Sequence, residues 1–207
     1  MLKPITFVSI SLGAAVLLLS LLAVRWFAPP AASQPAGSAA TGFVADIVIP
    51  PSTSPAPDFT LRDQNNQPVS ITTVRGRVVA LTFLDSHCKQ LCPLEADQLA
   101  QVQRSLGKNV PVSVLVVSVA PATDTPESER AFAAEHHWTG DWHWLTGTQA
   151  QLAAVWKDYS IAVQITPEDI IHSSVLYLID RDGYERAGFA AGLVPDLVAR
   201  DIRFLAA

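Results

Sequence analysis

Two short segments of the chain consist almost entirely of apolar residues. They cover 78–84 (VVALTFL) and 112–119 (VSVLVVSV). A continuous apolar run of this length is typical of a strand that is covered on both faces. Both segments are therefore predicted to be central strands of a sheet.

Between and after these strands, apolar residues recur at helical spacing. The first such pattern runs from Leu94 to Leu106, and Gly107 ends it. Pro126 begins another pattern, because a proline suits the first turn of a helix and acidic residues follow it. The patterns predict helices over 94–106, 126–136, 148–159 and 194–205.

Shorter apolar segments separated by turn residues predict two hairpins. In the first, 59–61 and 69–71 flank a polar turn at 63–67. In the second, 174–179 is followed by Asp182-Gly183 and then by 184–189. The alternation of strands and helices predicts an α/β domain with a central parallel portion and a terminal antiparallel hairpin.

The amino-terminal part of the chain differs from the rest. Residues 4–24 are apolar and carry no charge, and a helix of this length crosses a bilayer. A cleaved signal peptide is the alternative, but the run is longer than usual and Arg25 follows it. We therefore expect a transmembrane anchor at 1–28. No Lys or Arg occurs from Trp26 to Leu61, which favours an extracytoplasmic domain on a single-pass cell-membrane protein.

A segment rich in Pro, Ala and Ser follows the anchor and is expected to be a linker at 29–55. Within it, the apolar segment 43–49 is expected to dock on the domain as an edge strand. The globular domain is expected at 56–207, which is long enough for one buried core.

The composition and charge of the chain exclude one class of function. Charged residues make up 16% of the 207 residues, and the formal net charge is −5. Because nucleic-acid binding depends on neutralising phosphates with basic residues, it is not expected for this chain.

The two cysteines, Cys88 and Cys92, lie between a predicted buried strand and the helix that follows it. Pro93 suits the first turn of that helix, and a helix N-terminus favours the thiolate form of nearby cysteines. A thioredoxin-like fold has its redox or metal site at this position. Two thiolates and one imidazole suit Cu(I), whereas zinc prefers four ligands. The alternative is an inert structural pair or disulfide.

The five histidines are candidates for the third ligand. We expect His136 and His137 to interact with the terminal carbonyls of their helix, and His143 to pack between two tryptophans. The side chain of His87 is expected to diverge from the adjacent sulfur. His172 lies in a segment before a strand pattern, and in a thioredoxin-like domain this loop faces the cysteine loop.

Five segments over about residues 56–207 resemble the Sco/SenC family of membrane-anchored copper proteins that assist cytochrome oxidase assembly. They are PDFTL at 57–61, C-x3-CP at 88–93, DTPE at 124–127, LTGT at 145–148, and HS at 172–173 with LYLID-x-DG at 176–183. The resemblance implies a thioredoxin-like fold, with Cys88, Cys92 and His172 as copper ligands. Four positions depart from the family pattern: Lys89-Gln90 replace Pro-Asp, Asp85 replaces an aromatic residue, and Ala120 replaces Asp.

If the resemblance holds, the protein is an exported metallochaperone whose acceptor is the dinuclear copper site of cytochrome c oxidase subunit II, or another exported copper-site protein. The alternative is a thiol-disulfide oxidoreductase in which Cys88 and Cys92 form a redox-active dithiol. Either function needs a thiol reductase as a partner, because metal binding and exchange both require reduced cysteines. A peroxidase function is supported only by the thioredoxin-like layout.

Overall fold

The computed structural model describes residues 42–166 and 169–207. Within these residues, no helix combines the length and the apolarity needed to cross a membrane. The predicted anchor at residues 4–24 lies outside the described part of the chain.

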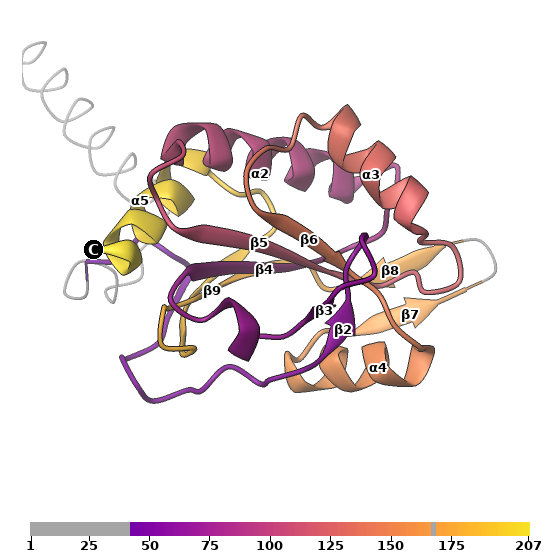
Figure 1. Ribbon diagram of the computed structural model, residues 1–207, viewed down its shortest axis with the longest axis horizontal. Helices are drawn as coiled ribbons and strands as arrows, with labels where there is room; N and C mark the ends of the chain where they lie inside the picture. Colours follow the sequence, from indigo (N-terminus) through magenta and orange to yellow (C-terminus); the bar gives the residue numbers. More distant parts are fainter. Residues whose placement is uncertain (1–41, 167–168) are drawn as a thin grey trace, which may run out of the picture. The chain divides into compact units, whose positions relative to one another are not determined.

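The core of the domain is a six-stranded sheet in the order β1-β10-β9-β4-β5-β6 (Figure 1). Strands β4 (Val78–Leu84), β5 (Val112–Ser118) and β6 (Trp142–Leu145) are parallel to one another. Strands β9 (Val175–Ile179), β10 (Glu185–Ala190) and β1 (Ile47–Val48) complete the sheet in antiparallel pairs. This arrangement confirms the predicted central parallel portion and terminal antiparallel hairpin.

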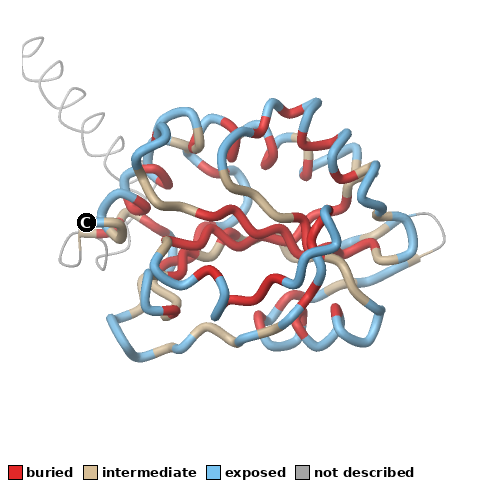
Figure 2. The backbone as a smooth tube through the Cα atoms, viewed as in Figure 1, coloured by how far each residue is buried: buried red, intermediate tan, exposed pale blue. Residues whose placement is uncertain are grey.

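Helices cover both faces of the sheet, so its strands are mostly buried (Figure 2). The first core contains residues of α2 (Leu91–Leu106), α3 (Pro126–Glu135) and α5 (Pro195–Ala206). The second core contains residues of α4 (Gln149–Asp158), of the hairpin β2 (Leu61–Arg62) and β3 (Pro68–Val69), and of the 3₁₀ helix η1 (Thr72–Val74). All seven residues of β4 are buried, as a strand covered on both faces requires.

Local sequence signals explain where the helices begin. Thr125 caps α3 and Thr148 caps α4, each through a capping box with the third residue of its helix. Helix α2 begins at Leu91, earlier than predicted, and its buried face includes Cys92, Ala96 and Leu99. Leu94 is exposed, so its inclusion in the predicted apolar face was wrong.

The amino-terminal segment at 43–49 packs on the domain, as its apolar pattern predicts. Phe43 and Ala45 are buried, and β1 pairs with β10 at the edge of the sheet. The buried carboxylate of Asp201 in α5 accepts the backbone N–H groups of Val44 and Ala45 at 3.1 Å. The packed domain therefore begins before the expected boundary at residue 56.

Two features were absent from the sequence prediction. Strand β6 is short, and it is a strand because it pairs with β5. Strands β7 (Val163–Ile165) and β8 (Ile170–His172) form a separate two-stranded sheet, where a loop was expected. His172 is therefore the last residue of a strand.

Candidate functional site

The two cysteines lie where the carboxyl end of β4 leads into α2. This edge of a parallel sheet is the usual position of binding sites in α/β folds. Cys88 is half-buried in the connecting loop, and Cys92 is buried in the first turn of α2. Both are free thiols.

The environments of the two thiols differ in their effect on ionisation. The Cys92 side chain donates a hydrogen bond to the Cys88 sulfur, and this bond is the main reason why the pKa of Cys88 is lowered to about 5. The backbone N–H groups of Gln90 and Cys92 lower the pKa of Cys88 further. No side chain caps α2, so the backbone N–H groups at this helix end are free to stabilise the Cys88 thiolate. The bond to Cys88 and burial both raise the pKa of Cys92.

His172 approaches these sulfurs from the β7-β8 hairpin. Its Nε2 lies 3.8 Å from Cys92 Sγ, although the two residues are 80 positions apart in the chain. Its Nδ1 lies 3.0 Å from the carbonyl oxygen of Ser173. Because a carbonyl only accepts, Nδ1 carries a proton and donates it there. In the neutral ring, Nε2 then has a free lone pair directed toward the thiols.

A buried carboxylate lies behind the thiols. Glu95, one turn along α2 from Cys92, is only 6% exposed. It accepts hydrogen bonds from Thr82 of β4 and from Ser174 Oγ, the latter at 2.8 Å. Burial raises the pKa of Glu95 despite these two donors. Glu95 therefore links α2 to the segment that directly follows His172.

The thiols and His172 line a cavity of about 120 Å³, together with Glu95 and Ser174. Cys88 also lines a wider cleft of about 640 Å³ with Lys89, Gln90 and Ala120. The positions that depart from the family pattern therefore form the surface around Cys88.

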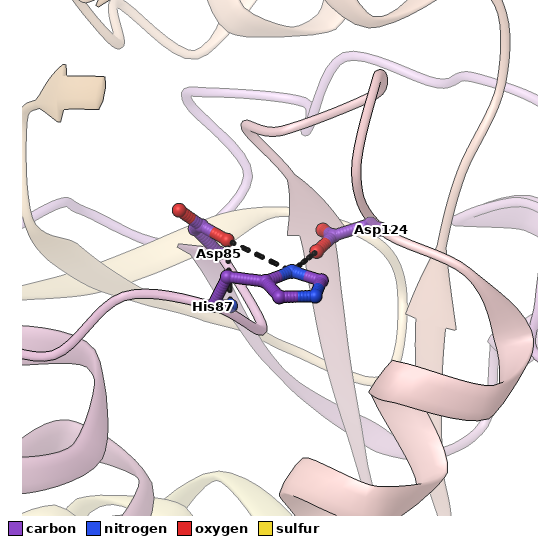
Figure 3. Close-up of side chains that lie close together, drawn as sticks. All are labelled: Asp85, His87 and Asp124. Carbon is purple, nitrogen blue, oxygen red and sulfur yellow. Dashed lines mark hydrogen bonds and ion pairs between the residues drawn. The ribbon is translucent and has the colours of Figure 1, made fainter. Parts of the chain in front are cut away.

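Three of the other histidines pair with carboxylates rather than with the thiols. The Nδ1 of His136 pairs with Asp97 of α2 at 2.8 Å, so the expectation that this side chain interacts with helix carbonyls was wrong. His143 pairs with Asp63 at 3.0 Å and with Asp141 at 3.3 Å instead of only packing between tryptophans. The ring of His87 points toward Asp85 and Asp124 (Figure 3).

Sequence reasoning missed Glu95 as part of this site. Its signal was an acidic residue three positions after Cys92, on the face of α2 that packs on the sheet. The donors that satisfy Glu95 come from β4 and from Ser174, the residue before β9, and no local pattern predicts them.

The donor set fits a soft metal ion. Two sulfurs, one of them readily ionised, lie beside an imidazole nitrogen with a free lone pair, and this combination suits copper. The same dithiol at a helix N-terminus suits thiol-disulfide exchange. Fold and site together define the class: a thioredoxin-like α/β domain with a dithiol and a neighbouring histidine.

Comparison with known proteins identifies the family. Residues 50–207 match the sequence model of the SCO1/SenC family, and the chain belongs to this family. It is 30% identical over 131 residues to the SCO1 protein homolog of Bacillus subtilis, covering 60% of this chain and 68% of that protein. It is 32% identical over 137 residues to the mitochondrial SCO2 protein of Saccharomyces cerevisiae, of which it covers 44%.

Solved structures agree with this assignment. ScoI of Bradyrhizobium japonicum, solved with copper bound, superposes with a TM-score of 0.66 at 26% identity, over 73% of this chain and 99% of that one. BsSco, described as a member of the Sco family of cytochrome c oxidase assembly proteins with a disulfide switch, gives a TM-score of 0.66 at 26% identity. That match covers 77% of this chain and 97% of BsSco.

Proposed function

We propose that this chain is a copper metallochaperone that binds its cargo through Cys88, Cys92 and His172. The observation that carries the proposal is the approach of His172 Nε2 to Cys92 Sγ at 3.8 Å, beside a Cys88 thiol that ionises readily. The copper bound to the related ScoI of Bradyrhizobium japonicum supports the choice of metal.

The proposed acceptor is the dinuclear copper centre of cytochrome c oxidase subunit II, to which the protein delivers copper or whose thiols it prepares. The description of BsSco as a cytochrome c oxidase assembly protein supports this role. Because the site lies at a sheet edge in an open cleft, an acceptor can reach Cys88 without unfolding the domain.

Ligation is tested by titrating the reduced full chain with Cu(I) against a competing chelator. We expect the reduced protein to bind one copper ion tightly. Cys88→Ser and Cys92→Ser should each abolish this binding, since each removes one of the three proposed copper ligands. Unchanged affinity in either variant would refute the assignment.

The role of His172 is tested with Cu(II). We expect His172→Ala to weaken binding and to change the sulfur-to-copper charge-transfer absorption. His136→Ala is the matched control, because His136 pairs with Asp97 away from the thiols. An unchanged spectrum in His172→Ala would exclude His172 as a ligand.

A second candidate function is thiol-disulfide exchange, which the unequal ionisation of the two cysteines favours. The Cys88 thiolate attacks an acceptor disulfide and displaces one acceptor thiolate. Cys92, once deprotonated, then attacks Cys88 and releases the second acceptor thiolate. The acceptor disulfide is reduced to two thiols, and the Cys88–Cys92 dithiol is oxidised to a disulfide, which a thiol reductase must reduce again.

His172→Ala separates the two functions, because the imidazole is a copper ligand but takes no part in the exchange step. We expect this variant to keep exchange with a model disulfide and to lose copper-dependent support of the oxidase in cells. Normal oxidase copper content under limiting copper would favour the oxidoreductase. Normal complementation by Cys88→Ser would refute both functions.

We further propose that residues 4–24 anchor the protein in the cell membrane, with the domain on the extracytoplasmic side. The support is the charge-free apolar run and the lack of basic residues from Trp26 to Leu61. Peptide mapping of the membrane-bound protein should recover a peptide from within residues 1–24. A mature terminus between about residues 29 and 41 would show that the segment is a cleaved signal.

A further inference from the structure

Beside the thiols, three side chains from two loops converge on one point (Figure 3). His87 Nδ1 lies 3.8 Å from Asp85 Oδ1 and 3.8 Å from Asp124 Oδ1. Asp85 and His87 follow β4, whereas Asp124 follows β5 and precedes α3. None of the three belongs to the donor set of Cys88, Cys92 and His172.

The spacing is longer than that of a direct hydrogen bond. A charge-assisted hydrogen bond between an imidazole and a carboxylate measures about 2.7–2.9 Å, about 1 Å shorter than both separations. Two ligand atoms held about 2.1 Å from one metal ion lie about 3.4 Å apart at the tetrahedral angle of zinc and about 3.0 Å apart at the 90° angle that Cu(II) prefers. The His87 nitrogen is therefore about 0.4–0.8 Å too far from each carboxylate oxygen, and the three ligand atoms all lie within 4.8 Å of one another.

The charge at this point also favours a cation. The side chain of Asp124 is 0% exposed and that of Asp85 is 12% exposed. Among the described residues, His87 is the only basic side chain within ion-pair distance of either carboxylate. Burial raises the pKa of Asp124, because its charged form is desolvated. When both carboxylates are ionised beside a neutral imidazole, one divalent cation balances their two negative charges.

The surrounding hydrogen bonds hold Asp124 in position. Its Oδ2 accepts hydrogen bonds from Ser118 Oγ at 2.6 Å and from Trp144 Nε1 at 3.1 Å. Its Oδ1 accepts hydrogen bonds from the backbone N–H and the hydroxyl of Ser86, and that hydroxyl also lies 2.8 Å from Ser128 Oγ. When a metal ion approaches Oδ1, the Ser86 hydroxyl can donate to Ser128 instead. Such partners orient metal ligands in known sites.

His143 provides the contrast within the same domain. It also lies between two carboxylates, but it pairs directly with Asp63 at 3.0 Å and with Asp141 at 3.3 Å, one through each ring nitrogen. Both nitrogens of His143 are therefore paired with carboxylates. Nδ1 of His87 instead lies 3.8 Å from each of its carboxylates, and its hydrogen-bond contact is with Ser86 Oγ at 3.1 Å, which a metal ion at Nδ1 replaces.

We propose that Asp85, His87 and Asp124 form a second metal site, which takes a borderline divalent cation such as Cu(II). One imidazole and two carboxylates suit Cu(II) or Zn²⁺, and the Irving–Williams order places Cu(II) above Zn²⁺. Asp85 and His87 line the same cleft as Cys88, so the second site adjoins the thiols without sharing a ligand with them.

The test removes the thiols first. The full chain carrying Cys88→Ala and Cys92→Ala is titrated with Cu(II) by calorimetry, and electron paramagnetic resonance reports the nitrogen ligands. We expect one saturable equivalent with hyperfine coupling to a single imidazole nitrogen. Adding His87→Ala should weaken this binding at least tenfold and remove the nitrogen coupling, and adding Asp85→Asn should weaken it by about tenfold.

His143→Ala in the same background is the matched control, and we expect it to change neither the affinity nor the spectrum. His87 is 53% exposed, so its substitution should leave the fold intact, which circular dichroism checks. Absence of saturable binding, or equal binding with and without His87, would overturn the second site. Because both cysteines are removed, the result does not depend on the proposed copper site at the thiols.

Discussion

The hydrogen bond from Cys92 to the Cys88 sulfur controls the ionisation of Cys88, and Cys92→Ala removes it. This bond is the largest cause of the lowered pKa of Cys88, which is about 5 compared with an ordinary value of 9.0. Without the donor, burial opposes the charged form and only the backbone N–H groups still favour it. We therefore expect the pKa of Cys88 in Cys92→Ala to rise back toward 9.0.

The size of the effect follows from two opposing factors. At pH 6 a thiol of pKa about 5 is about 90% thiolate, whereas one of pKa 9.0 is about 0.1% thiolate, a ratio of about 900. Thiolate nucleophilicity falls with pKa, with a Brønsted coefficient of about 0.4–0.5, which over this shift costs a factor of about 40–100. Native Cys88 should therefore react about 10–20 times faster than Cys88 of Cys92→Ala at pH 6.

The assay is the rate of iodoacetamide alkylation of reduced, chelator-treated protein from pH 4 to pH 10, with the modified peptide identified by mass spectrometry. Above pH 9 both thiols are largely ionised, so the order of rates should reverse and the variant should react faster. Cys92→Ser keeps a hydroxyl donor and should retain most of the native profile. If the profile of Cys92→Ala matches the native one, the hydrogen bond does not control Cys88.

Three other side chains give further predictions. Glu95→Ala removes the acceptor for Thr82 and Ser174 and so loosens the segment after His172. The copper affinity measured by chelator competition should fall by about tenfold or more, whereas the rate of Cys88 alkylation should not change. An unaltered copper affinity would exclude a positioning role for Glu95. The buried Glu129 carboxylate has no hydrogen-bond partner among the described residues, and burial raises its pKa to about 7. Since this folded pKa exceeds the ordinary 4.5, the native protein should lose stability as the pH rises from about 4.5 to 7. Glu129→Gln should remove that loss and raise the free energy of unfolding in urea at pH 8 by about 1–2 kcal/mol. A variant with the native pH dependence would contradict this. Phe43 is 2% exposed and packs edge-to-face on Phe204, with the ring centroids 4.9 Å apart. Phe43→Ala should therefore lower the free energy of unfolding by about 3 kcal/mol. No change would show that segment 43–49 contributes nothing to stability.

The sequence by itself determined the elements whose signals are local. The apolar runs at 78–84 and 112–119 became β4 and β5, because a strand buried on both faces needs no polar alternation. Pro126 marked the start of α3, since a proline suits the first helical turn, and the helical pattern from Thr148 marked α4. The position of the cysteines between a strand and a helix N-terminus was equally local. The choice of His172 among five histidines came from the family resemblance.

The tertiary structure alone decided which distant residues meet. Strand β6 and the β7-β8 hairpin are too short to be recognised without their pairing partners. Leu94 fits an apolar helical pattern but faces solvent, because the sheet covers the side of α2 that carries Cys92 and Leu99. The contact of Cys92 in α2 with His172 in β8 joins segments that lie far apart in the chain. The contact of His87 with Asp124 likewise joins two distant loops, and all four residues lie near one edge of the sheet. Parallel strands end at a common edge, so their loops converge there only once the strand order is set, and no local pattern of residues carries that order.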